Sequence, residues 1–140
     1  MKFLDRYKTD KSLEDDGVFV DYGDGLMVKV RRLNSTKSKE VRRKLEKPFS
    51  KQFRGQDIPD SIQEKLLNQQ MAKAIVVDWE GVPDPDDETG EKMLPCTEEN
   101  ILRMVEDFPD FRDDILAASM ERATFQAEDL KAVAKNSKPS

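Results

Sequence analysis

The segment from Glu80 to Pro95 constrains the fold most, because it cannot form a helix and it divides the chain into two parts. It holds three prolines, two glycines and six acidic residues. Proline inside a helix removes a backbone N–H and clashes with the preceding turn, and glycine is a second local breaker. We therefore expect an exposed loop or a loose hairpin here, with separate elements on either side.

Two short runs rich in β-branched and aromatic residues, Gly17–Tyr22 and Leu26–Val30, lie in the first part of the chain. Gly23-Asp24-Gly25 separates them, and its glycines allow the positive φ angles of a tight turn. The pattern predicts a β-hairpin, which must pack on other elements because an isolated hairpin is marginal in water. Residues 1–16 are polar and have no sustained period, so we expect them to form a flexible arm.

Apolar residues at helical spacing predict four helices. The oxygens of Asn34-Ser35-Thr36 can cap the first, which Pro48 should stop; the second runs from Pro59 to about Val77. Thr97 caps the third, which ends near Phe108, and Pro109 starts the last. The last helix should reach about Lys135, with an apolar stripe that weakens along its length: Phe111, Ile115, Ala118, Phe125, Leu130 and Val133.

Length and composition favour one domain with a thin core. The chain has 140 residues, 36% hydrophobic and 38% charged, so a single compact domain with polar, mobile termini is expected. The predicted fold class is mainly α with a small N-terminal β-hairpin (α+β). Its helical domain spans residues 17–135, between the arm at 1–16 and a disordered tail at 136–140.

Charge is distributed unevenly along the chain. Between Lys29 and Arg54 there are eleven Lys or Arg against two Glu, a net of +9, while the whole chain carries −5 and the remainder therefore −14. Such asymmetry favours an anionic partner or weak head-to-tail self-association, in which a basic face meets an acidic one. A solvated basic face is the alternative interpretation.

The residue types needed for common catalytic sites are missing. The chain has no histidine and one cysteine, Cys96, and it shows no Gly-rich phosphate loop. Asp84, Asp86 and Glu88 alternate like the start of a calcium loop, but glycine is absent from the sixth position and Pro95 occupies the twelfth. We expect no enzyme activity, no cofactor and no metal site, and an acidic loop that is simply solvated.

A group of basic residues and the tryptophan could bind a partner. Six basic residues in the segment 29–54 could follow a phosphate backbone, although few aromatic residues accompany them: Arg31, Arg32, Lys39, Arg42, Arg43 and Lys44. Trp79, the only tryptophan, is either a core anchor, which we favour, or a partner contact. Nucleic-acid binding ranks second to protein binding, because the rest of the chain is acidic.

The second half of the chain resembles the tail assembly chaperones of siphophages. The similarity rests on the order of several motifs: Ala74-Ile-Val-Val-Asp-Trp-Glu-Gly-Val82, Lys92-Met-Leu-Pro95, Thr97-Glu-Glu-Asn100, Pro109-Asp-Phe111 and a final helix with Phe125. The resemblance covers a little under half of the chain firmly. It implies a mostly helical protein that binds the tape-measure protein, and possibly also the tail tube protein, and keeps the former soluble before the tube polymerises.

The same resemblance implies a location in the host cell cytoplasm and absence from the mature virion. No apolar run is long enough for a membrane helix, and Met1–Arg6 becomes charged too early for a signal peptide, so no membrane association is expected. A structural tail or head-completion protein retained in the virion is a further alternative. Within the last helix, we assign Phe125, Leu130 and Val133 to partner contact and Phe111, Ile115 and Ala118 to the core.

Overall fold

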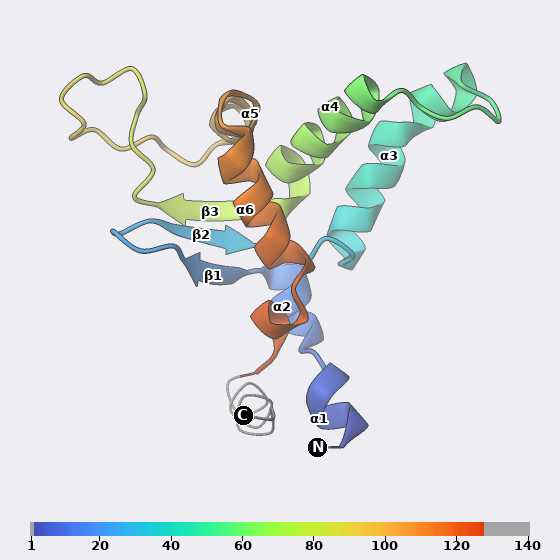
Figure 1. Ribbon diagram of the computed structural model, residues 1–140, viewed down its shortest axis with the longest axis horizontal. Helices are drawn as coiled ribbons and strands as arrows, with labels where there is room; N and C mark the ends of the chain where they lie inside the picture. Colours follow the sequence, from blue (N-terminus) through green and yellow to red (C-terminus); the bar gives the residue numbers. More distant parts are fainter. Residues whose placement is uncertain (1, 128–140) are drawn as a thin grey trace.

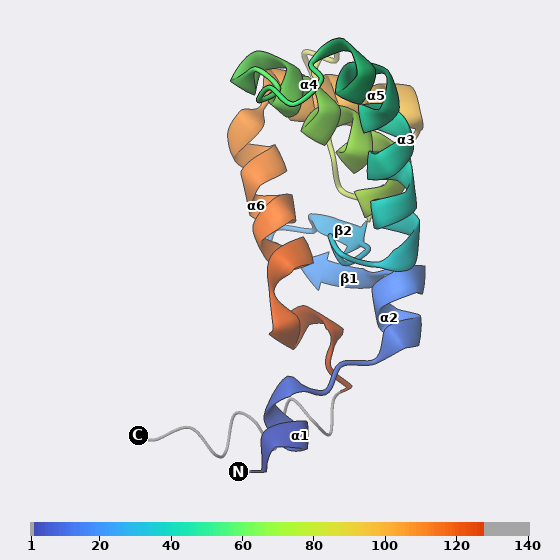
Figure 2. The ribbon, with the colours of Figure 1, turned by 90° about the vertical axis from the view of Figure 1, so that its right-hand side faces the viewer.

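A three-stranded antiparallel sheet lies at the centre of the protein, surrounded by helices (Figures 1 and 2). The computed structural model describes residues 2–127. The strands pair in the order β1 (Val18–Asp21), β2 (Met27–Val30) and β3 (Val76–Glu80). Four longer helices are α3 (Thr36–Gln52), α4 (Asp60–Gln70), α5 (Glu98–Asp107) and α6 (Pro109–Met120). The mainly helical fold with one small sheet confirms the predicted class.

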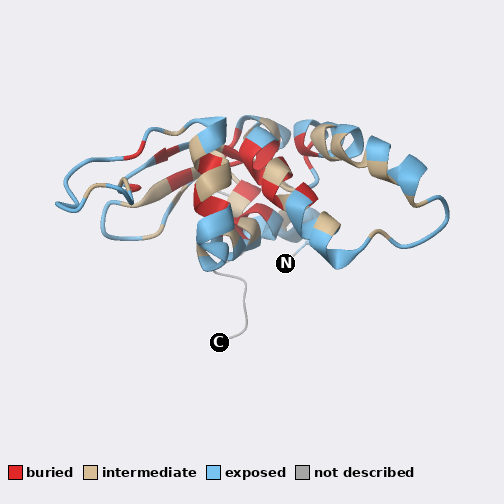
Figure 3. Ribbon diagram, turned by 90° about the horizontal axis from the view of Figure 1, so that it is seen from above, coloured by how far each residue is buried: buried red, intermediate tan, exposed pale blue. Residues whose placement is uncertain are grey.

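Four short elements complete the described chain. Two α-helices precede the sheet, a π-helical turn ends α4, and a 3₁₀ turn follows α6: α1 (Phe3–Tyr7), α2 (Lys11–Asp16), η1 (Met71–Ile75) and η2 (Arg122–Phe125). One hydrophobic core joins β2, β3, α5 and α6 with the two turns η1 and η2. Figure 3 shows the buried residues gathered in the middle of the elongated molecule, with exposed segments at both ends.

The predicted hairpin is confirmed. Val18 pairs with Val30 and Val20 with Val28. The turn between the strands has φ angles of 85°, 54° and 81° at Gly23, Asp24 and Gly25, a region that glycine enters without strain. Val28 and Val30 are fully buried, whereas Phe19 is exposed on the opposite side, so only one face of the sheet is covered.

The third strand was not predicted. The expected helix ends at Ile75, and the chain enters β3 directly from the π-helical turn. A register shift beside Lys29 and Val30 leaves Val77 as an extra residue in β3. Because this bulge offsets the alternation of side chains, Val76 and Trp79 both face the core. The apolar run Ile75-Val76-Val77 continues the helical stripe in sequence, which concealed the change to a strand.

Pro48 does not end α3, contrary to the prediction. The helix continues to Gln52, and Pro48 lies inside it. Its ring is exposed, so water can satisfy the carbonyl group of Lys44 that loses its intrahelical donor. Together α3 and α4 form a helical hairpin that extends from the body of the molecule (Figure 1).

The remaining predicted helices begin as expected. The Thr97 hydroxyl oxygen accepts a hydrogen bond from the Asn100 amide at 3.1 Å, which caps α5, and Pro109 occupies the first turn of α6. Between β3 and α5 the acidic segment forms a loose hairpin, in which Pro83 and Met93 make an isolated bridge.

The last helix is shorter than predicted. It ends at Met120, and Glu121 is extended, with φ −81° and ψ 125°. This change of direction brings η2 back to the body and buries Phe125 completely. The assignment of Phe125 to an exposed partner contact is therefore wrong, whereas Ile115 is buried as expected. Leu130 and Val133 lie outside the described residues.

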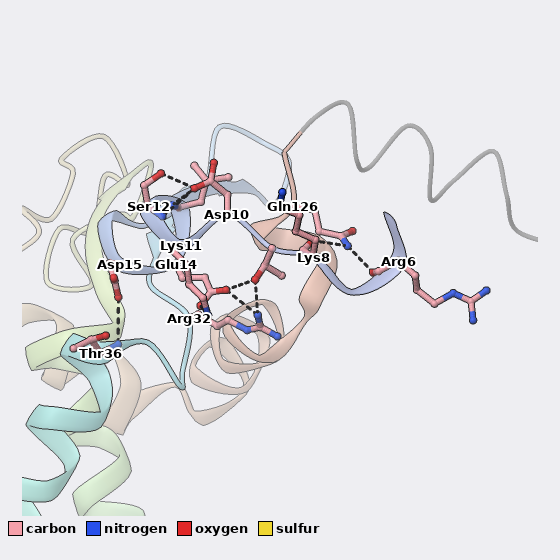
Figure 4. A network of polar contacts seen from close by, with 12 residues as sticks. Arg6, Lys8, Asp10, Lys11, Ser12, Glu14, Asp15, Arg32, Thr36 and Gln126 are labelled. Atoms are coloured by element: carbon pink, nitrogen blue, oxygen red, sulfur yellow. Dashed lines mark hydrogen bonds and ion pairs between the residues drawn. The ribbon is translucent and has the colours of Figure 1, made fainter. Parts of the chain in front are cut away.

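Residues 2–16, which were expected to form a flexible arm, contain the helices α1 and α2 and make hydrogen bonds to the rest of the chain. The Asp10 side chain accepts from the Ser12 amide at 2.9 Å and so caps α2. The Gln126 side-chain amide donates to the Arg6 carbonyl oxygen at 2.7 Å, which ties α1 to the chain beyond η2 (Figure 4). The bond between Gln126 and Arg6 could not be predicted from local polarity, because the two residues lie 120 positions apart.

Glu14 fixes this N-terminal segment to the sheet. Its carboxylate is buried and lies 3.1 Å from the Arg32 guanidinium (Figure 4). Burial alone would raise the pKa of Glu14, but the hydrogen bonds from Thr9 and Arg32 and the charge of Lys11 outweigh it, and the pKa is lowered. The carboxylate stays ionised at neutral pH and holds α2 against the start of the basic segment.

Replacing Phe125 by Ala should destabilise the isolated protein by about 3 to 5 kcal/mol, because the change leaves a cavity at a fully buried site. Urea unfolding followed by circular dichroism measures the effect. Met120→Ala is the matched control, since Met120 is 57% exposed and should change stability by less than about 0.5 kcal/mol. Equal, small effects of both changes would contradict the placement of Phe125 in the core.

Gly81→Ala should be more destabilising than Gly90→Ala, although both glycines have a similar positive φ, 77° and 72°. A Cβ at Gly81 would lie 2.2 Å from the Gly25 carbonyl oxygen, whereas nothing lies within 4 Å at Gly90. Both variants carry the backbone penalty of about 1 to 2 kcal/mol, and Gly81→Ala adds about 1 to 3 kcal/mol of overpacking. Urea midpoints compare them, and equal midpoints would contradict the close approach of the two turns.

Candidate functional site

The six predicted basic residues do not form one surface. Arg31 donates to two backbone carbonyl oxygens, that of Asp15 at 2.6 Å and that of Ala74 at 2.9 Å. Arg32 is engaged by Glu14, as described above. Both guanidinium groups connect the N-terminal segment to the sheet, so they serve the fold, and the predicted patch is reduced to the residues on α3.

Lys39, Arg42 and Arg43 line an open cleft of about 610 Å³ between α3 and α4. Leu33 and Leu67 give this cleft an apolar part, and its other lining residues are polar: Asn34, Glu46 and Gln70. Arg42 is bonded to Glu46 and lies 3.4 Å from the Gln70 side-chain oxygen. We call this concavity the basic cleft.

Lys44 does not line the basic cleft. It lies 3.1 Å from Glu40 on an exposed face of α3, and the shallow concavity beside it is lined by Lys44, Lys47, Pro48 and Lys51. The helix therefore presents basic groups on two faces, because Lys39 and Arg43 are four residues apart on one side and Lys44 and Lys51 are seven apart on another.

Trp79 is a core residue. It is 6% exposed, its indole N–H donates to the Leu94 carbonyl oxygen at 2.8 Å, and its ring centroid lies 6.5 Å from that of Phe111. These contacts confirm the interpretation as a core anchor and leave no exposed ring for a partner. Trp79 thereby joins β3, the end of the acidic hairpin and α6.

An apolar groove lies directly beside this anchor. Its volume is about 530 Å³, and it lies where the chain leaves β3 and where α5 meets α6. Seven of its lining residues have large apolar or proline side chains: Leu26, Val82, Pro83, Met104, Phe108, Pro109 and Phe111. The others are Gly81, Asp107 and Asp110. We call it the corner groove.

Phe108 is the most exposed aromatic side chain of the corner groove, at 47%. It lies between α5 and α6, with φ −128° and ψ 76°, and it makes no side-chain cap for α6. Asp107 and Asp110 flank it and are exposed. An apolar concavity with acidic residues at its edge is a suitable surface for an amphipathic segment that carries basic residues.

The corner groove was not predicted from the sequence. Phe108 fits the apolar stripe of the third predicted helix, which implied burial. The sequence signal that could have distinguished Phe108 is Pro109, because a residue before proline leaves the helical conformation and its side chain leaves the stripe.

Two carboxylates of the acidic hairpin, those of Asp86 and Asp87, make internal contacts. Asp86 pairs with Arg103 through two hydrogen bonds of 2.8 and 3.0 Å, and those bonds lower its pKa. Asp87 accepts from the Lys92 amide at 2.7 Å, which lowers its pKa as well. Within residues 2–127, no group of three or more His, Cys, Asp or Glu is arranged to hold a metal ion.

Cys96 is the remaining residue with reactive chemistry. Burial, together with the negative charge of Asp78, raises the pKa of its thiol to about 11, so at neutral pH it is protonated and a poor nucleophile.

Over the part of the chain that the structure describes, no helix combines the length and the apolar character needed to cross a membrane.

Comparison with known proteins gives one match. No curated protein and no solved structure matches the chain. The family model described as YdaY prophage protein matches residues 33–136, about three quarters of the chain. The match includes the basic cleft, β3, the acidic hairpin and the junction of α5 and α6, while the β1–β2 hairpin precedes it. The chain belongs to the family of YdaY prophage proteins, and hence is a protein of phage origin.

Proposed function

We propose that this phage protein is a tail assembly chaperone that binds the tape-measure protein and keeps it soluble, without catalysis. One observation carries the proposal: two of the motifs that resemble the chaperone family lie about thirty residues apart in sequence, yet they meet at the corner groove. Gly81 and Val82 form one side of the groove, and Pro109, Asp110 and Phe111 form another.

The groove has the properties that a helix-binding surface needs. Phe108 provides an aromatic contact that is accessible in the free protein, and Val82 and Met104 form a buried apolar base. A tape-measure chain is long and largely helical, so its apolar stripe is a suitable occupant in helix-in-groove recognition. Basic residues beside that stripe would face Asp107 and Asp110.

The proposed groove is pre-formed, which favours binding. Trp79 holds Phe111 in place, and the close approach of Gly81 to Gly25 fixes the wall that contains Leu26. A surface ordered before binding loses little conformational entropy on association. We propose that the protein acts in the host cytoplasm during assembly and is absent from the mature virion.

Phe108→Ser should weaken binding to the phage's own tape-measure protein by at least about tenfold, since it removes the accessible aromatic contact. Serine is a favourable residue before a helix, so the change should leave the stability of the free protein within about 0.5 kcal/mol. Co-expression followed by affinity purification and titration measures both the solubility of the tape-measure chain and the affinity.

Met120→Ser is the control, because Met120 is an equally accessible apolar residue outside the groove, and it should bind like the wild type. If Phe108→Ser binds as tightly as the wild type, the corner groove is not the binding surface. If the wild-type protein neither retains nor solubilises the tape-measure chain, the chaperone function itself is wrong.

A further inference from the structure

We propose that the basic cleft binds the acidic hairpin of a second copy of this chain, so that copies associate head to tail. The proposal is independent of the chaperone function and of the corner groove. It rests on three observations: the chemistry of the cleft, the chemistry of the hairpin, and their positions in the molecule.

The basic cleft combines positive charge with apolar surface. Lys39, Arg42 and Arg43 line it together with Leu33 and Leu67. Helix α3 as a whole carries seven Lys or Arg against two Glu, a net of +5. A ligand that fits this cleft should therefore present carboxylates next to an apolar side chain, rather than negative charge alone.

The acidic hairpin offers this combination. Residues 80–95 carry six acidic residues against one lysine, a net of −5. Met93 is 48% exposed among them, and Glu88 and Glu91 are exposed as well. A phosphate backbone would match the charge of the cleft but would leave its leucines without a partner.

Backbone hydrogen bonds and an ion pair hold the hairpin in shape, which lowers the entropic cost of docking. The Asp84 amide donates to the Lys92 carbonyl oxygen at 2.8 Å, and Leu94 donates to Val82 at the same distance. Arg103 holds Asp86 against α5. Glu88, Glu91 and Met93 are thus presented on a fixed loop.

The two surfaces lie at opposite ends of the molecule. Figure 1 shows the acidic hairpin beyond the free end of the sheet and α3 on the other side, and Figure 3 shows the same separation from above. One chain therefore cannot dock its own hairpin into its own cleft. The contact is heterologous, because the cleft of one copy binds the hairpin of the next. Each pair therefore still has one vacant cleft and one vacant hairpin, and association can continue from copy to copy.

Sedimentation velocity on the full chain tests the proposal at about 200 μM, a concentration suited to weak affinities. At about 50 mM salt the wild type should sediment as a concentration-dependent mixture larger than the monomer, and at about 300 mM salt the mean mass should fall toward the monomer, because screening weakens exposed charge pairs. A wild-type protein that remains monomeric at low salt, or that associates more strongly at high salt, overturns the proposal.

Charge reversal on each surface identifies the contact. A cleft variant, Lys39→Glu with Arg43→Glu, and a hairpin variant, Glu88→Lys with Glu91→Lys, should each be monomeric alone. Their equimolar mixture should associate again and grow beyond the dimer, because the basic cleft of one variant meets the acidic hairpin of the other, and the reversed cleft meets the reversed hairpin. Combining all four changes in one chain exchanges the charges of the two surfaces and should restore association.

The matched control reverses the same charge on another face of α3, Lys47→Glu with Lys51→Glu, and should retain most of the association. If this control dissociates as fully as the cleft variant, the basic cleft is not the docking site.

Met93→Ser should weaken association at both salt concentrations. A labelled single-stranded DNA is the competing ligand: tight binding by the wild type that is lost in the cleft variant would assign the cleft to nucleic acid and overturn the proposal.

Discussion

The burial of Trp79 is the interaction on which most of the structure depends. One face of the three-stranded sheet needs a cover, and Trp79 links that face to α6 through Phe111 and to the end of the acidic hairpin through Leu94. The bulge in β3 is what directs Trp79 and Val76 to the same side. Since large rings contribute much of the buried apolar area in a small core, this contact positions both walls of the corner groove.

The thin core explains why the two ends of the molecule carry the exposed surfaces. Apolar residues suffice to bury the centre, and the α3–α4 hairpin and the acidic hairpin project from it (Figure 3). The projecting segments are held by polar contacts instead, such as Arg103 with Asp86 and Arg42 with Glu46. Exposed ion pairs of this kind contribute little stability individually.

Local patterns predicted the elements whose determinants lie close together in sequence. The β1–β2 hairpin followed from its turn glycines, α5 from the cap at Thr97, and the start of α6 from Pro109. The errors occurred where distant residues decide the outcome. The N-terminal segment is ordered by Gln126 and Arg32, and η2 turns back because Phe125 fills a place in the core.

The predicted site differs from the observed one for the same reason: contacts with residues distant in sequence decide which side chains are accessible. Sequence placed six basic residues in one patch, but Arg31 and Arg32 face the N-terminal segment, and their contacts with Asp15 and Glu14 cannot be inferred from spacing. Trp79 was correctly interpreted as a core anchor. The corner groove could not be predicted, because its walls come from β3, the β1–β2 turn and the α5–α6 junction.

We propose that the tape-measure protein binds at the corner groove while the core beneath it stays intact. Hydrogen–deuterium exchange of the free protein and of its complex with the tape-measure protein measures this directly. Binding should slow exchange at Gly81 and Val82 and across residues 104–111, and leave residues 39–46 of α3 unchanged. Protection confined to α3, or faster exchange around Trp79 and Phe125 on binding, would contradict the claim, since the partner would then use another surface or open the core.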